Sequence, residues 1–141
     1  MSDSARHLHL ILHALTSLPP SQTPPKLAIL AHKVDLLKSG SSAHASAGNL
    51  AINRVKTVLE RELEKRRQSQ SGGVHIEALG QEGENSELGG LTCGEKEDSP
   101  FRFDEWDGGE VTFLATSINS ANSEKGETGV GSLSEWLEET M

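Results

Sequence analysis

The sequence has few of the residues that give a small protein a self-sufficient core. Aromatic residues make up 4% of its 141 residues, tyrosine is absent, and Cys93 is the single cysteine. Together with 14 glycines, this composition predicts that only part of the chain packs. One cysteine excludes an internal disulfide and a metal site built from several cysteines, and it is compatible with a reducing compartment. Because the stretch Leu91-Thr92-Cys93-Gly94-Glu95 contains no cationic residue, we expect an unreactive loop thiol.

Long apolar runs and an excess of positive charge are also missing. No segment approaches the roughly 20 apolar residues that span a bilayer, and the first residues do not have the pattern of a signal peptide. The formal net charge of −8 and the pI near 5.2 argue against general binding to nucleic-acid phosphates or to anionic lipid. We therefore expect a soluble, intracellular chain that binds no nucleic acid and does not itself insert into a membrane.

The first patterned segment, residues 5–18, predicts an amphipathic helix that Pro19 and Pro20 end. Its apolar stripe consists of Leu8, Ile11, Leu12 and Leu15. His9 and His13 are one helical turn apart and fall outside this stripe. They have the spacing of two metal ligands, but no third ligand is in register, so exposed histidines are the favoured interpretation.

Residues 27–31 form a short apolar run that predicts a core strand of a parallel sheet. Four residues follow this run, His32-Lys33-Val34-Asp35, and all of them except Val34 are polar. Ligands of open α/β sheets bind beyond the carboxyl ends of such strands. We therefore expect Lys33 and Asp35 to face a ligand, although a plain salt pair in a loop has the same spacing.

A second helix is predicted over residues 49–68, with an apolar stripe of Ile52, Val55, Leu59 and Leu63. Its basic residues are Arg61, Lys65, Arg66 and Arg67. Glu60, Glu62 and Glu64 interleave with them, so we interpret this side as a solvated face rather than a nucleic-acid site. Ion pairs are expected between Glu62 and Arg66 and between Glu64 and Arg67.

The remaining chain divides into a polar insertion and a second ordered part. Residues 69–100 have no apolar period and are predicted to be a disordered acidic insertion. After it, residues 101–103 predict an edge strand, residues 107–109 a turn and residues 110–115 a second core strand. A closing helix should begin at Ser132, whose side chain would form a capping box with Glu135. Its apolar face would be Leu133, Trp136 and Leu137, with Trp136 in the core.

These elements predict an α/β fold in which two strands joined through a helix lie parallel. They divide the chain into an ordered part over residues 1–68, the insertion over 69–100, and a second ordered part over 101–141. The two ordered parts are expected to build one partial domain around a common sheet. Its carboxyl edge would carry the polar residues that follow each strand.

The strand ends resemble the two base-reading loops of small GTPases. His32-Lys33-Val34-Asp35 resembles the Asn/Thr-Lys-x-Asp motif, with His32 in the first position, and Ser117-Ile118-Asn119 follows the next strand where that family has Ser-Ala-Lys. The long charged helix, the Phe-x-Phe segment and the closing Leu-x-x-Trp-Leu helix together resemble the β subunit of the signal recognition particle receptor, an Arf-like GTPase family. The resemblance implies GTP as the ligand, read by His32, Lys33, Asp35, Ser117 and Ile118. It also implies the receptor α subunit as partner and the cytosolic face of the endoplasmic reticulum membrane as location.

Two motifs of that family are absent from the sequence. Neither the phosphate loop, Gly-x-x-x-x-Gly-Lys-Ser/Thr, nor an Asp-x-x-Gly switch motif before the first helix occurs. The resemblance therefore implies the carboxyl-terminal half of a P-loop-GTPase-like sheet with flanking helices, lacking its first four strands, and a chain that does not hydrolyse GTP. The alternative is a small non-enzymatic interaction module in which the acidic region 77–110 binds a basic partner.

Overall fold

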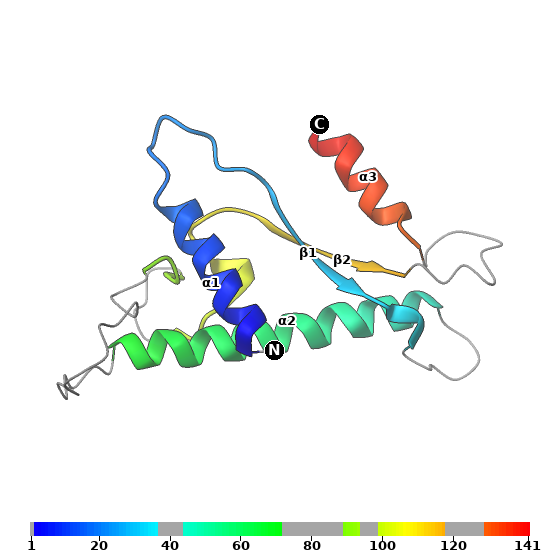
Figure 1. Ribbon diagram of the computed structural model, residues 1–141, viewed down its shortest axis with the longest axis horizontal. Helices are drawn as coiled ribbons and strands as arrows, with labels where there is room; N and C mark the ends of the chain where they lie inside the picture. Colours follow the sequence, from blue (N-terminus) through cyan, green and yellow to red (C-terminus); the bar gives the residue numbers. More distant parts are fainter. Residues whose placement is uncertain (1, 37–43, 72–88, 94–98, 118–128) are drawn as a thin grey trace. The chain divides into compact units, whose positions relative to one another are not determined.

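The computed structural model describes residues 2–36, 44–71, 89–93, 99–117 and 129–141, without the side chains of residues 35, 44–46, 70 and 71. The elements in these ranges are α1 (Ser2–Thr16), β1 (Leu27–His32), the 3-10 turn η1 (Val34–Leu36), α2 (His44–Ser71), the 3-10 turn η2 (Phe103–Glu105), β2 (Val111–Thr116) and α3 (Gly131–Thr140) (Figure 1). They form two compact units. Unit 1 contains Met1–Pro25 and Val58–Glu110, and unit 2 contains Lys26–Thr57 and Val111–Met141.

Unit 2 is built on a parallel sheet of β1 and β2, with Leu27 opposite Val111 and His32 opposite Thr116. This confirms the predicted α/β class and the predicted parallel pairing. Successive side chains of a strand point to opposite faces, so Ala31 and its neighbour Ala115 share one face. The first half of α2 packs on that face, and small residues let it approach closely. Ala31, Val34, Ala47 and Ala51 form the buried cluster, with Val55 and Ala115 packed against it.

The closing helix begins differently from the prediction. α3 starts at Gly131 with Val130 as its N-cap, and no side chain caps it. The hydroxyl of Ser132 instead donates to the carbonyl oxygen of Ala115, 3.4 Å away. The predicted capping box is therefore wrong, because Ser132 lies inside the helix and bonds to the end of β2. Trp136 is half-buried rather than a core residue.

In unit 1, α1 buries Leu8 and Leu12 of the predicted stripe, but its buried face is shifted from that stripe. Ala5, Leu8, His9 and Leu12 are buried, whereas Ile11 is 46% exposed. The predicted exposure of His9 is thus wrong: its Nε2 lies 3.3 Å from the carbonyl oxygen of Gly89. Because α1 is apolar on more than one side, two stripes with helical spacing overlap, and packing selects the one that contains His9.

The predicted edge strand over residues 101–103 is also wrong. The amide of Phe101 donates to Glu64 Oε2 at 2.8 Å, and the amide of Phe103 donates to Glu60 Oε1 at 3.2 Å. These carboxylates take the place of a neighbouring strand, and Phe103 then enters η2. The prediction of a solvated glutamate face therefore fails at Glu60, which is buried, and at Glu64, which is half-buried.

The predicted disordered insertion, residues 69–100, is ordered at both ends. α2 continues to Ser71, and Leu91 and Cys93 are buried. Cys93 also forms an antiparallel bridge with Trp106, whose indole Nε1 donates to the carbonyl oxygen of Gly90 at 2.8 Å. Residues 72–88 and 94–98, which include most of the acidic region 77–110, lie outside the described residues.

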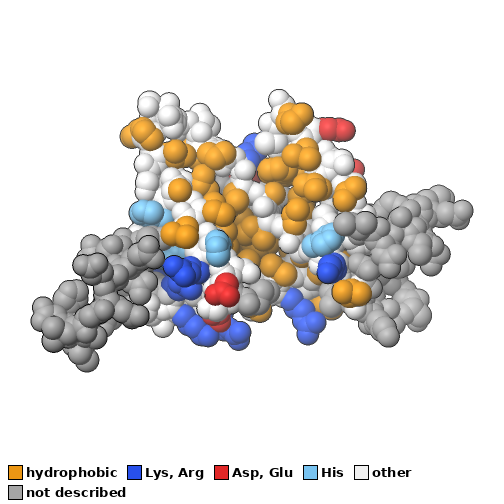
Figure 2. All heavy atoms as spheres, in the orientation of Figure 1, with side chains coloured by type: hydrophobic (Ala, Val, Ile, Leu, Met, Phe, Trp, Pro, Cys, Tyr) orange, Lys and Arg blue, Asp and Glu red, His pale blue; other side chains and the backbone are white. Residues whose placement is uncertain are grey.

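Several large apolar side chains remain at the surface. Figure 2 shows apolar side chains at the surface, and the exposed ones include Leu10, Ile11, Leu30 and Leu50. None of the helices in the described part of the chain has the length and apolar character needed to cross a membrane.

Candidate functional site

The carboxyl edge of the β1–β2 sheet brings together three of the five predicted site residues. His32 and Thr116 are the last residues of their strands and pair with each other in the register. Lys33 and Ser117 follow directly, so both leave the sheet at the same edge. Parallel strands joined by a helix produce this arrangement, and ligands of α/β sheets bind at such edges.

The two strand ends are joined by their side chains. His32 Nδ1 lies 3.0 Å from Thr116 Oγ1, and Thr116 is only 2% exposed. The sequence pattern alone gives Thr116 no particular role. Thr116 can be recognised only once the strand register is known, because its contact with His32 requires that these two residues lie opposite each other in β1 and β2.

The turn after β1 has a constrained backbone. Lys33 has φ of 61°, a left-handed conformation that costs a side-chain-bearing residue roughly 1–2 kcal/mol. The amide of Leu36 donates to the carbonyl oxygen of Lys33 at 3.1 Å, and buried Val34 anchors the turn in the core. Lys33 itself is exposed. The backbone of Asp35 lies in η1, and its side chain is outside the described part.

The loop after β2 begins with a buried hydroxyl. Ser117 is 4% exposed, and its amide donates to the carbonyl oxygen of Gly129 at 3.3 Å. Its Oγ has no hydrogen-bond partner among the described residues. A buried polar atom without a partner costs about 1–3 kcal/mol, so an unpaired hydroxyl here would lower the stability of the loop that follows β2. Ile118, the fifth predicted site residue, lies outside the described residues, as does Asn119.

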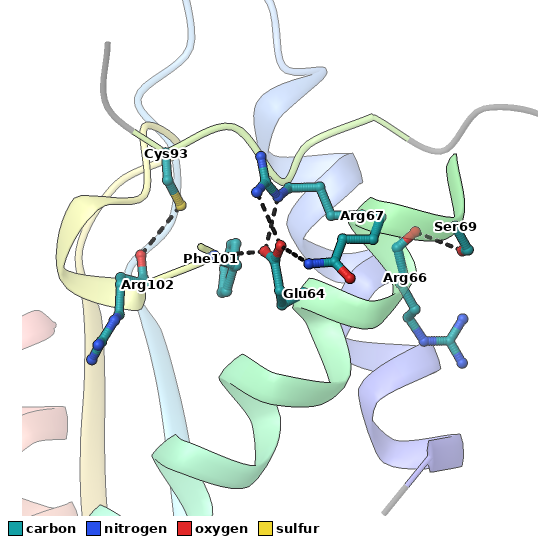
Figure 3. A network of polar contacts seen from close by, with 8 residues as sticks. Glu64, Arg66, Arg67, Ser69, Cys93, Phe101 and Arg102 are labelled. Carbon is teal, nitrogen blue, oxygen red and sulfur yellow. Dashed lines mark hydrogen bonds and ion pairs between the residues drawn. The ribbon is translucent and has the colours of Figure 1, made fainter. Parts of the chain in front are cut away.

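A second polar network lies in unit 1, around Glu64 (Figure 3). Arg67 donates from Nε to Oε2 at 2.9 Å and from a terminal nitrogen to Oε1 at 3.0 Å. Gln68 donates to Oε1 at 2.8 Å, and the Phe101 amide binds Oε2. The hydrogen bond from Arg67 is the main cause that holds the pKa of Glu64 below its ordinary value. With both oxygens bonded inside the protein, this carboxylate has a structural role.

Other candidate reactive groups are similarly occupied or incomplete. Burial raises the pKa of the Cys93 thiol, and its Sγ donates to the carbonyl oxygen of Arg102 at 3.4 Å. This agrees with the expected unreactive thiol. Within the described ranges, no group of three histidine, cysteine, aspartate or glutamate residues could hold a metal ion. The carboxyl edge of the sheet therefore remains the candidate site.

A solved structure resembles this arrangement along nearly the whole chain. The structure is described as that of the mammalian SRP receptor, and the match has a TM-score of 0.61 with 21% sequence identity. It covers 99% of this chain but 53% of the other, so this chain spans about half the length of that one. At this identity the likeness shows the fold alone, a two-stranded parallel sheet with flanking helices. No protein-family model matches the sequence, and no curated protein matches it.

Proposed function

We propose that the chain is the base-reading half of a GTP-binding subunit related to the signal recognition particle receptor. The observation that carries this proposal is the register that brings His32-Lys33 and Thr116-Ser117 to one sheet edge, in a fold that matches the SRP receptor structure. The buried Ser117 hydroxyl supports it, because that group lacks a partner in the described part of the protein.

The proposed chemistry follows from the residue types at this edge. Asp35 accepts hydrogen bonds from the two guanine donors, N1–H and the 2-amino group, since a carboxylate offers two acceptor oxygens. The Lys33 stem lies over the base, and Ser117 and Ile118 form the second loop. GTP is the proposed ligand. No phosphate loop occurs in the 141 residues, so base contacts supply the affinity and the chain hydrolyses no GTP.

The proposed setting is co-translational protein targeting at the endoplasmic reticulum membrane, with the receptor α subunit as partner. Its support is the SRP receptor description of the matching structure together with the resemblance of the strand-end motifs. Co-expression with the α subunit tests it. A stable complex that survives purification supports the assignment, and its absence contradicts the partnership without affecting the proposed base contacts.

Exchange of Asp35 tests the proposed base recognition directly. Titration with GTP and with XTP, followed by backbone amide shifts of Lys33 and Ser117, compares wild type with Asp35→Asn. Xanthine has a 2-oxo group in place of the 2-amino group, so the Asn amide should move the preference toward XTP. Glu138→Gln, an equal charge change on an exposed residue of α3, should leave the preference unchanged. Equal binding of both nucleotides by both proteins would refute the role of Asp35.

A further inference from the structure

The sequence contains two places where a hydroxyl residue precedes proline, and both have a basic residue three positions after the hydroxyl. They are Thr23-Pro24-Pro25-Lys26 and Ser99-Pro100-Phe101-Arg102. Proline has no backbone N–H, so a kinase groove without an acceptor for that group selects it. The later cation can pair with phosphate or carboxylate groups of the enzyme. The two segments therefore carry the same pattern for a proline-directed protein kinase, and only their structural settings differ.

The Thr23 segment is open to an enzyme. All four of its residues are exposed, and residues 23–25 belong to no helix or strand. The neighbouring backbone hydrogen bond closes a turn before them, from the amide of Gln22 to the carbonyl oxygen of Pro19 at 2.9 Å. No hydrogen bond within the described part of the chain holds residues 23–25 themselves. Because the proline that follows disfavours a helical conformation of Thr23, this hydroxyl lies in a segment that an active site can accept as it stands.

The Ser99 segment is fixed to the core of unit 1. Ser99 is half-buried, and Phe101, two residues later, is 1% exposed. The Phe101 amide donates to Glu64 Oε2 at 2.8 Å, and the carbonyl oxygen of Arg102 accepts from Cys93 Sγ at 3.4 Å (Figure 3). Phosphoryl transfer needs the hydroxyl in line with the γ-phosphoryl group of the nucleotide, so the residues around the hydroxyl must leave the protein surface. For Ser99, this removes Phe101 from its buried position and breaks its hydrogen bond to Glu64.

We propose that Thr23 is a phosphorylation site for a proline-directed protein kinase, and that the fold protects Ser99 from the same enzyme. Thr23 Oγ1 forms a bond to the γ-phosphorus of ATP, and the bond from that phosphorus to the oxygen bridging the β-phosphate breaks. ADP leaves, and the hydroxyl proton passes to a base of the kinase. The product carries about 1.5 to 2 negative charges at Thr23, shortly before β1. Neither the strand-end residues nor the proposed function enters this inference.

The native full-length chain, treated with a cyclin-dependent kinase and ATP, tests the site. Mass spectrometry of the digested product locates the phosphoryl group and gives its rate of incorporation at each hydroxyl. We expect phosphorylation of Thr23 in wild type and in Thr23→Ser, and its loss in Thr23→Ala. Ser99 should react at least about tenfold more slowly, the factor expected when a hydrogen bond to a charged group must break first. Absence of phosphate from Thr23, or equal rates at the two hydroxyls, would overturn the proposal.

A variant of the buried segment separates protection by the fold from an intrinsically poor motif. Phe101→Ala removes the side chain that fixes the segment and keeps Ser99, Pro100 and Arg102. The rate at Ser99 should rise about tenfold or more, since the hydrogen bond to Glu64 no longer has a buried ring to hold it in place. The rate at Thr23 should stay as in wild type and serves as the internal control. An unchanged rate at Ser99 would show that the fold does not protect it, whether or not unit 1 remains folded in the variant.

Discussion

The two compact units differ in what their side-chain hydrogen bonds hold in place. In unit 1, the carboxylates of Glu60 and Glu64 bind the backbone amides of Phe103 and Phe101, so an irregular segment is fixed to α2. In unit 2, the hydroxyl of Ser117 is buried without a partner in the described part of the chain. Each unit leaves one buried side-chain atom without a partner among the described residues, Nδ1 of His13 in unit 1 and Oγ of Ser117 in unit 2.

The two units also differ in their apolar cores, because unit 1 buries larger side chains than unit 2. Unit 1 contains fully buried Phe101 and Leu63, and the rings of Phe101 and Phe103 meet edge to face with centroids 5.1 Å apart. Unit 2 relies on alanines and half-buried strand residues, and Leu30 of β1 is 44% exposed. Because buried area supplies most of the folding free energy, we expect unit 1 to be the more stable of the two units.

The largest effect is expected when the aromatic core of unit 1 is removed. Phe101→Ala should lower the free energy of unfolding of this unit by about 3–5 kcal/mol, the usual cost of truncating a fully buried Phe. Trp106 belongs to unit 1 and Trp136 to unit 2, and these are the two tryptophans of the chain. Urea unfolding in a Trp136→Phe background, followed by fluorescence of Trp106, therefore reports on unit 1.

The matched control is the same truncation in unit 2. The Phe113 ring is half-buried and lies under Lys56 Nζ, 5.9 Å from the ring centroid. Phe113→Ala should move the Trp106 transition by less than about 1 kcal/mol, as for changes away from the core that is monitored. Equal shifts for the two variants would mean that the two units unfold together, and the expected difference in stability between them would be wrong.

The sequence predicted unit 2 better than unit 1, for a physical reason. The parallel pairing of β1 with β2 follows from apolar runs separated by a helix, a local signal combined with a general rule of topology. The position of residues 101–103 depends on Glu60 and Glu64, about 40 residues earlier in the chain, and alternation of Phe and Arg gives no sign of that contact. The alternation of apolar and polar residues therefore led to the wrong prediction of a strand over residues 101–103.

The candidate site shows the same limit. His32, Lys33 and Ser117 could be predicted because each follows a recognisable strand. Thr116 could not, because its importance comes from a hydrogen bond that depends on register. His9 failed for a related reason: only packing decides between two overlapping apolar stripes of one helix, and it buries His9.

Acid should weaken unit 1 selectively. The pKa of Glu64 lies below its ordinary value of 4.5, chiefly because Arg67 donates a hydrogen bond to the ionised group. The depressed pKa means that the stability it contributes is fully present above about pH 4.5 and is lost as pH falls through the lower folded-state value. Carboxyl groups titrate mostly below about pH 5. Urea midpoints from Trp106 fluorescence should therefore fall steeply in wild type as the pH is lowered below this value.

Two variants separate this contribution from general acid destabilisation. Glu64→Gln removes the titration at this position, so its midpoint should be lower at neutral pH and should depend less on pH in the acid range. Glu62→Gln affects a half-buried carboxylate whose pKa is also lowered, chiefly by a hydrogen bond from exposed Lys65. Because Lys65 lies one turn away in the same helix, whereas Glu64 also binds the Phe101 amide, Glu62→Gln should change the profile less than Glu64→Gln. If Glu64→Gln and wild type lost stability in parallel, Glu64 would not be the group that links acid to unit 1.

The smallest expected effect concerns the attachment of α3 to the sheet of unit 2. The Ser132 hydroxyl reaches the Ala115 carbonyl oxygen at 3.4 Å, near the outer limit of a hydrogen bond, so Ser132→Ala should destabilise unit 2 by roughly 0.5 kcal/mol or less. Amide hydrogen exchange measures this, because local opening near Ala115 and Leu133 should become faster while amides of unit 1 keep their rates. Ser134→Ala is the matched control, since that hydroxyl bonds to Val130 within the same helix end and does not reach the strand. A larger effect at Ser132 would mean that α3 contributes more to the stability of unit 2 than its half-buried side chains indicate. The difference in stability between the two units would then be smaller than we expect.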